Sequence, residues 1–68
     1  MMGWQVNLRD PTGRLVNARR APTKQGASEI AQLHCQQRGA QAEVVRMPLA
    51  VVKRRYWRDD AGLQWIDY

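Results

Sequence analysis

Residues 51–68 read VVKRRYWRDDAGLQWIDY, and the turn RDDAG at 58–62 inside this stretch predicts a β-hairpin. An almost identical turn, RDPTG, lies at 9–13. In each turn an Asp favours a type I turn, and Gly62 or Gly13 takes the left-handed conformation that completes a bulged three-residue loop. The chain is therefore expected to contain two antiparallel hairpins, one near each end.

The first hairpin is expected to be half buried. Its predicted register sets Leu8 opposite Val16 and Val6 opposite Ala18, so that apolar and polar side chains separate onto different faces. The apolar face would hold Trp4, Val6, Leu8, Val16 and Ala18.

The segment KQGASEIAQLHCQQRG at 24–39 predicts the one helix of the chain. Thr23, which follows a proline, is a plausible N-cap, and Gly39 is the expected stop. The stripe that would face the core consists of Ala27, Ile30, Ala31 and His34. His34 lies at the edge of this stripe, which favours a hydrogen-bonded structural histidine over a functional one.

The remaining chain predicts three more strands, at about 41–47, 51–58 and 63–68, with a turn around Pro48. The expected fold class is α+β, with the element order ββαβββ. One helix would pack on one face of a five-stranded antiparallel sheet and leave the other face to solvent. No linker or repeat divides residues 1–68, so a single compact domain is expected.

Composition points to an anionic partner. Eleven Lys and Arg face six Asp and Glu, which gives a net charge of +5 and a sequence pI near 10.4. Only two of the eleven are Lys, and guanidinium groups bind phosphate and carboxylate in bidentate fashion. The excess therefore favours a nucleic acid, a nucleoprotein or an acidic protein surface, although charge also serves solubility alone.

Catalysis, metal binding and membrane insertion are not expected. A chain of 68 residues builds only a small core, and the sequence has no glycine-rich phosphate loop, nucleophile elbow or paired acid–base carboxylates. The single His34 and the single Cys35 cannot supply a four-ligand zinc site, and no cofactor is predicted. The apolar runs are too short to span a bilayer, so the protein is expected to be cytoplasmic.

The cluster of cations and rings at 51–58 is the strongest functional signal. Strand alternation sends Val52, Arg54, Tyr56 and Arg58 to one face, and the other residues to the opposite face. The predicted hairpin register pairs Trp57 with Trp65 and Arg55 with Asp67, and it places Glu43 beside Arg54. If the even-numbered side is core, the exposed patch consists of Arg46, Lys53, Arg55, Trp57 and Trp65. If the two Trp residues are buried instead, the outward set is Arg54, Arg58 and Tyr68.

Four features are spread along the chain. They are the aromatic first strand at Trp4, the helix pattern Ala27-x-x-Ile30-Ala31 before Gly39, the VVRM strand at 44–47 and the ending YWRDDAGLQWIDY. In these features the whole chain resembles the small phage-encoded anti-CRISPR proteins, most of all the ninth family of type I-F inhibitors.

This resemblance implies a protein that docks on the multisubunit CRISPR surveillance complex, along the backbone subunits near the guide, and blocks pairing with target DNA. It also implies nonspecific attraction of double-stranded DNA and a location in the cytoplasm of an infected bacterial host. Gln36, Gln37 and Arg38 stand where the family uses polar and basic helix residues. The residues expected to contact a partner are Lys53, Arg54, Arg55, Trp57, Arg58, Arg46, Gln36, Gln37 and Arg38.

Two other readings remain open from the residues themselves. The first is a free-standing accessory protein that binds nucleic acid without sequence preference, because no helix-turn-helix, zinc finger or RNA-recognition sheet motif is present. The second is an assembly protein that dimerises through a sheet edge. A monomer or a weak dimer is expected in either case.

Overall fold

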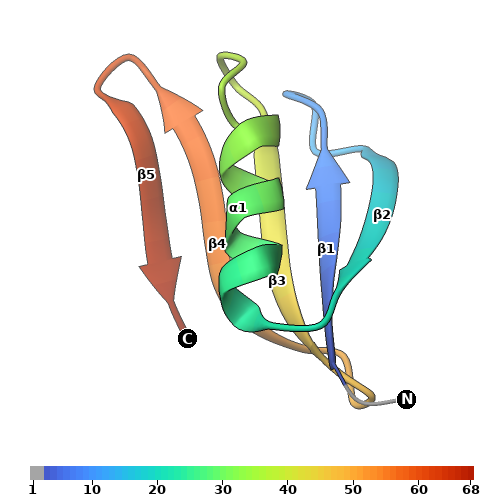
Figure 1. The fold of residues 1–68 in the computed structure, drawn as a ribbon. Helices are drawn as coiled ribbons and strands as arrows, with labels where there is room; N and C mark the ends of the chain where they lie inside the picture. Colours follow the sequence, from blue (N-terminus) through green and yellow to red (C-terminus); the bar gives the residue numbers. More distant parts are fainter. Residues whose placement is uncertain (1–2) are drawn as a thin grey trace.

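The computed structural model describes residues 3–68 and shows the expected α+β architecture (Figure 1). Five strands form one antiparallel sheet in the order β2-β1-β3-β4-β5, and one helix packs on it. The elements are β1 (Gly3–Arg9), β2 (Leu15–Ala21), α1 (Lys24–His34), β3 (Gln41–Met47), β4 (Val51–Asp59) and β5 (Gly62–Asp67). The described helix is too short and too polar to cross a membrane.

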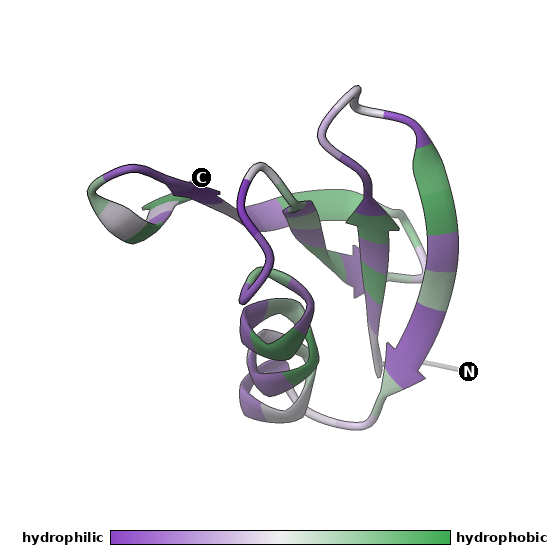
Figure 2. Cartoon of the chain, turned by 90° about the horizontal axis from the view of Figure 1, so that it is seen from above, coloured by the Kyte–Doolittle hydropathy of each residue, from purple (hydrophilic) through white to green (hydrophobic). Residues whose placement is uncertain are grey.

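The core lies between α1 and the middle of the sheet. Directly paired residues of antiparallel strands point to the same face, and the pairs Val6–Val44 and Leu8–Ala42 place four buried side chains under the helix. Figure 2 shows the helix on one side of the curved sheet. The helix presents small residues to this face, which permits a close approach to the strands. The fully buried residues on this side are Ala27 and Ala31 of the helix and Cys35, which follows it.

The helix begins where the sequence predicts and ends earlier. The Thr23 side chain accepts a hydrogen bond of 3.0 Å from the Gly26 amide, as an N-cap does. The last helical residue is His34, with Cys35 as C-cap, so the prediction of a helix reaching to Gly39 is wrong. Gly39 instead has a φ of +81° in the following loop, where a Cβ would lie 3.0 Å from Pro11.

The first hairpin contains a bulge that the sequence does not reveal. The predicted register holds next to the turn, where Arg9 pairs with Leu15, but Leu8 then pairs with Asn17, which leaves Val16 as the extra residue. The pairing of Leu8 with Val16 is therefore wrong. Because one added residue turns every following side chain to the other face, the predicted apolar face is also wrong on β2. Val16 is 55% exposed.

The loop of the second hairpin is one residue shorter than predicted. Asp59 pairs with Gly62, so that only two residues, at 60 and 61, connect the strands. The left-handed conformation predicted for the glycine is confirmed, with a φ of +104°. The shorter loop sets Tyr56 opposite Trp65 and Trp57 opposite Gln64, and the predicted Trp57–Trp65 pair does not form.

A second bulge lies between β3 and β4. Val44 pairs with Arg54 and Val45 with Val52, which leaves Lys53 as the extra residue of β4. Tyr56 is 3% exposed and packs in the core, so the even-numbered side of β4 faces the helix at this position, in agreement with the first of the two sequence interpretations.

Candidate binding surface

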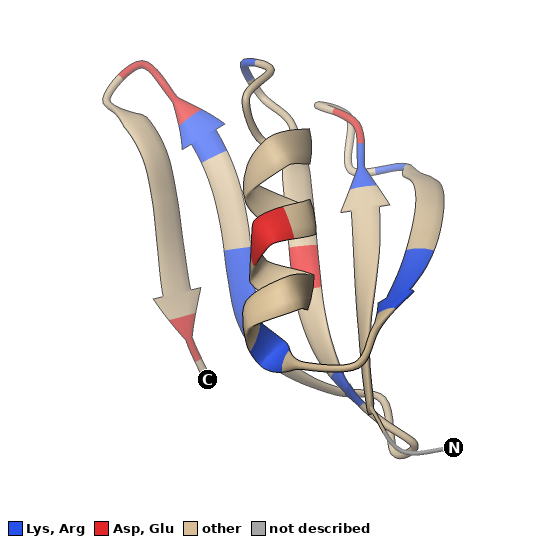
Figure 3. Ribbon diagram, viewed as in Figure 1, with Lys and Arg blue, Asp and Glu red and all other residues tan. Residues whose placement is uncertain are grey.

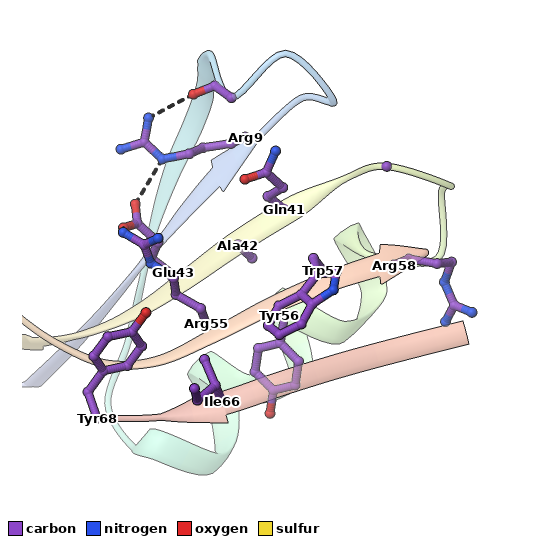
Figure 4. A pocket seen from close by; sticks show the side chains of 12 residues that line it. Arg9, Gln41, Ala42, Glu43, Arg55, Tyr56, Trp57, Arg58, Ile66 and Tyr68 are labelled. Carbon is purple, nitrogen blue, oxygen red and sulfur yellow. Dashed lines mark hydrogen bonds and ion pairs between the residues drawn. The ribbon is translucent and has the colours of Figure 1, made fainter. Parts of the chain in front are cut away.

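The open face of the sheet, on the side away from α1, carries the most organised group of polar and aromatic side chains. Pairing of Gln41 with Trp57 and of Glu43 with Arg55 places these four on that face. The curved sheet forms a hollow of about 630 Å³ there, with Arg9 and Tyr68 among its other lining residues (Figure 4).

Glu43 is the centre of this surface. Its Oε1 atom lies 2.8 Å from Arg9 Nε and its Oε2 atom lies 3.3 Å from Arg55 Nη2. The Glu43 residue is only 8% exposed, although it lies on the face that no helix covers. Arg9 also donates a 3.0 Å hydrogen bond to the Gly13 carbonyl. One carboxylate therefore holds two guanidinium groups in place, and the three groups together keep one positive charge.

Aromatic side chains complete the surface. The Arg55 guanidinium lies 5.8 Å from the centre of the Tyr68 ring, within cation–π range. The amide of Tyr68 donates a 3.0 Å hydrogen bond to the Lys53 carbonyl, which holds the backbone of this residue beside β4. Trp57 is half-buried and also lines the hollow. The surface thus offers fixed arginines and flat rings that a partner can contact.

Two predicted contact residues take structural roles on the opposite face. Arg54 forms a bidentate ion pair with Asp67 and donates a 3.0 Å hydrogen bond to the Tyr56 hydroxyl. This arrangement raises the pKa of Arg54 and lowers the pKa of the Asp67 carboxyl, chiefly through the hydrogen bonds between them. Arg58 donates a hydrogen bond to the carbonyl of Cys35, at the end of α1. The predicted Glu43–Arg54 and Arg55–Asp67 pairs are therefore wrong, because the register shift exchanges the partners.

The predicted patch is divided between the two faces. Arg55 and Trp57 share the open face, Arg46 and Trp65 lie on the helix side, and Lys53 is the bulged residue that has no pairing partner on β3. Trp65 is 56% exposed and its ring centre lies 6.4 Å from that of Tyr56. The single patch predicted from these five residues is therefore not present. Contact of each of these residues with a partner stays a prediction.

The predicted helix contacts lie outside the helix. Gln36, Gln37 and Arg38 occupy the exposed loop between α1 and β3, because α1 ends at His34. Arg38 pairs with Asp60 of the β4–β5 turn, with both side chains almost fully exposed. This loop lies at the opposite end of the helix from Lys24.

Cations also lie on β2 and at the start of α1 (Figure 3). Within residues 3–68, seven cations have no carboxylate oxygen within 4.0 Å; they are Arg14, Arg19, Arg20, Lys24, Arg46, Lys53 and Arg58, the last of which bonds to a carbonyl. Arg46 and Lys24 flank the Trp4 ring, at 5.0 and 6.0 Å from its centre. Sequence reasoning missed this group, although the run NARRA at 17–21 has no acid beside it.

His34 and Cys35 have structural positions. His34 Nε2 lies 2.8 Å from the Arg9 carbonyl, and since a carbonyl only accepts, this nitrogen donates. The expected hydrogen-bonded structural role of His34 is thus confirmed. Cys35 is fully buried, and burial raises the pKa of its thiol to about 11. Residues 3–68 contain no group of three or more side chains placed to hold a metal ion.

Comparisons of the chain with protein-family models, with curated proteins and with solved structures find no match.

Proposed function

We propose that this protein is a non-enzymatic binding protein that docks through the open face of its sheet onto a type I CRISPR surveillance complex in the cytoplasm of a bacterial host. Binding there blocks pairing of the guide with target DNA. The observation that carries the docking surface is the arrangement of Arg9 and Arg55 on Glu43, with Tyr68 and Trp57 beside them.

The geometry favours docking for an energetic reason. Arg, Tyr and Trp are the residues that most often dominate the binding energy of protein interfaces. An arginine that is already held by a carboxylate and a ring loses less side-chain entropy when a partner binds it. Arg55 is 54% exposed at its side chain, so it remains accessible while Glu43 fixes its position.

The choice of partner rests on the resemblance of the Trp4 strand, the helix pattern and the 56–68 ending to type I-F inhibitors. A surveillance complex is a nucleoprotein, and a small domain with a net charge of +5 is attracted to its RNA and to acidic surfaces nearby.

The test is a titration of purified type I surveillance complex with the protein and with two single variants. Arg55→Ala should weaken binding by about 30-fold or more, which corresponds to ~2 kcal/mol for an interface arginine. The matched control is Arg14→Ala, which removes an exposed cation of the β1–β2 loop that does not line the hollow and should change affinity less than about threefold. Circular dichroism checks that both variants fold. Absence of binding to type I complexes, or an Arg55→Ala variant that binds like the parent, would refute the proposal.

A second candidate function is sequence-independent binding of nucleic acid, and the unpaired cations of β2 and the Trp4 group favour it. Each phosphate contact adds a slope of about −0.9 to the dependence of log affinity on log salt for duplex DNA. A few contacts should therefore give weak binding that fades near physiological salt.

Two double variants of equal charge test where nucleic acid binds. Replacing Arg19 and Arg20 by Gln should reduce both the affinity for duplex DNA and the salt slope, measured by fluorescence anisotropy. Arg38 and Arg55 are already paired with carboxylates, so replacing these two by Gln should reduce the affinity and the salt slope clearly less. Equal losses in both doubles would show that only net charge matters, and tight salt-resistant binding to a consensus sequence would contradict this second candidate.

A further inference from the structure

The two edges of the sheet differ in how they are protected from pairing with another strand. Edge strand β2 carries Arg19 and Arg20, contains the Val16 bulge and is followed by Pro22. Charges, bulges and prolines are the devices that keep an edge strand from pairing. Edge strand β5 has the sequence GLQWID, which contains no proline and no bulge, and its one charged residue, Asp67, lies at its end.

The backbone of β5 is oriented for pairing at its outer side. The Tyr68 amide bonds to the Lys53 carbonyl, and antiparallel partners alternate, so the amides and carbonyls of 64, 66 and 68 point toward β4. Those of Leu63, Trp65 and Asp67 consequently point away from the sheet. Exposed apolar side chains lie beside these outward backbone groups on both faces of the sheet. Trp65 is 56% exposed on the helix side, and Ile66 is 51% exposed on the open face.

We propose that β5 is a self-association edge, where a second copy of this chain adds its own β5 in antiparallel orientation. The register centred on Trp65 satisfies the outward groups best, because Trp65 then pairs with the second copy's Trp65 and Leu63 pairs with the second copy's Asp67. This arrangement makes about six backbone hydrogen bonds and obeys a two-fold axis. The result is one continuous sheet in which the open faces of both copies adjoin.

Charge also favours a second copy at this edge. Residues 51–68 contain four cations and three acids, and Glu43 pairs with one of those cations, so this region is close to neutral. The cations without carboxylate partners lie mainly on β2 and around Trp4, toward the other edge of the sheet. Two copies that meet at β5 therefore keep their surplus charges far apart.

The association is expected to be weak. A six-residue edge buries less than the ~1,200 Å² of a standard stable interface, so a dissociation constant in the micromolar range or above is expected. This inference does not depend on the function proposed above, because it concerns the protein alone.

Sedimentation equilibrium of the whole chain tests the proposal between ~10 µM and ~1 mM, the range in which a weak dimer forms. The mass should rise with concentration from 7.9 kDa toward twice that value. Ile66→Lys places a charge on the β5 edge and should keep the protein monomeric. The matched control is Val16→Lys, which changes a similarly exposed residue on the other edge by the same charge and should leave dimer formation intact.

Amide hydrogen exchange of the unmodified protein gives a second measurement that needs no variant. Exchange at Leu63 and Trp65 should slow as the concentration rises, whereas exchange at the β2 edge should not change. A constant mass of 7.9 kDa together with constant exchange would refute the proposal. So would a Val16→Lys variant as monomeric as Ile66→Lys. A protein that stays monomeric alone, but whose Leu63 and Trp65 amides exchange more slowly when a partner protein is added, would assign this edge to the strand of a partner and overturn the self-association.

Discussion

Replacement of Glu43 by Gln should destabilise the fold although this residue lies on the face opposite the main core. The carboxylate accepts charge-assisted hydrogen bonds from Arg9 and Arg55, and such bonds contribute about 1.5–3 kcal/mol each when well shielded. The side chains of the two arginines are 34% and 54% exposed, so screening reduces this to ~1 kcal/mol each. The expected loss in the free energy of unfolding is therefore about 2 kcal/mol.

A loss of this size is easy to measure in so small a domain. The unfolding entropy of a globular protein is about 2.1 cal/mol/K per residue, so for 68 residues a loss of about 2 kcal/mol lowers Tm by roughly 14 °C. Thermal unfolding followed by circular dichroism gives this value. Glu29→Gln is the matched control, because Glu29 is exposed on α1 and has no ion pair recorded within residues 3–68. It should change the free energy of unfolding by no more than about 0.5 kcal/mol.

A double-mutant cycle separates the ion pair from other effects of the substitution. Combining Glu43→Gln with Arg9→Gln should give a coupling energy of about 1 kcal/mol, because each single change already removes the same interaction. A Glu43→Gln variant that melts within a few degrees of the parent, or a coupling energy near zero, would show that this carboxylate does not organise the open face.

Three further outcomes follow from the structure. Gly62→Val should lower the free energy of unfolding by roughly 1–2 kcal/mol in urea denaturation, because a β-branched residue resists the φ of +104° at this turn; unchanged stability would contradict the turn geometry. Arg54 lowers the pKa of Asp67, so the stability that this carboxyl adds is present above about pH 4 and is lost as the pH falls; the difference between the parent and Asp67→Asn should therefore shrink in acid. The Cys35 thiol, with its pKa raised to about 11 by burial, should react with a thiol reagent at pH 8 at least about tenfold more slowly in the native protein than in urea, and equal rates would show that it is exposed.

Local features of this chain could be predicted from the sequence because their causes are local. Thr23 caps the helix through its own side chain, and Gly13 and Gly62 take positive φ values because the turns require them. The order of the elements along the chain and the fold class follow from the alternation of the segments and from the two turns, whereas the central position of β3 beside β1 is known only from the structure. The helix end could not be predicted in this way, because the QQRG segment after Cys35 is held by contacts from β4, including the Arg58 bond to the Cys35 carbonyl.

Strand registers could not be predicted, because each depends on one extra or missing residue. Val16 and Lys53 are bulged out, and the second turn has two connecting residues in place of three. None of these events has a strong local signal, since a bulge is stabilised by packing across several strands. Successive side chains of a strand point to opposite faces, so one extra or missing residue moves every side chain beyond it to the other face of the sheet. The partner of Glu43 thus changes from the predicted Arg54 to Arg55.

This exchange explains why the site with the most cations in the sequence is not the site with the most free charge. The sequence gives the number of charges, but the strand register determines which of them form ion pairs. In the cluster at 53–58, Arg55 is paired with Glu43, Arg54 with Asp67, and Arg58 with a carbonyl, so that Lys53 alone has neither kind of partner recorded within residues 3–68. The surplus charge is instead concentrated on β2 and around Trp4. Docking through the ordered arginines of the open face and attraction of polyanions through the free cations are consequently separable by mutation: Arg55→Ala should affect the first far more than the second, and the Arg19 and Arg20 double substitution should do the reverse.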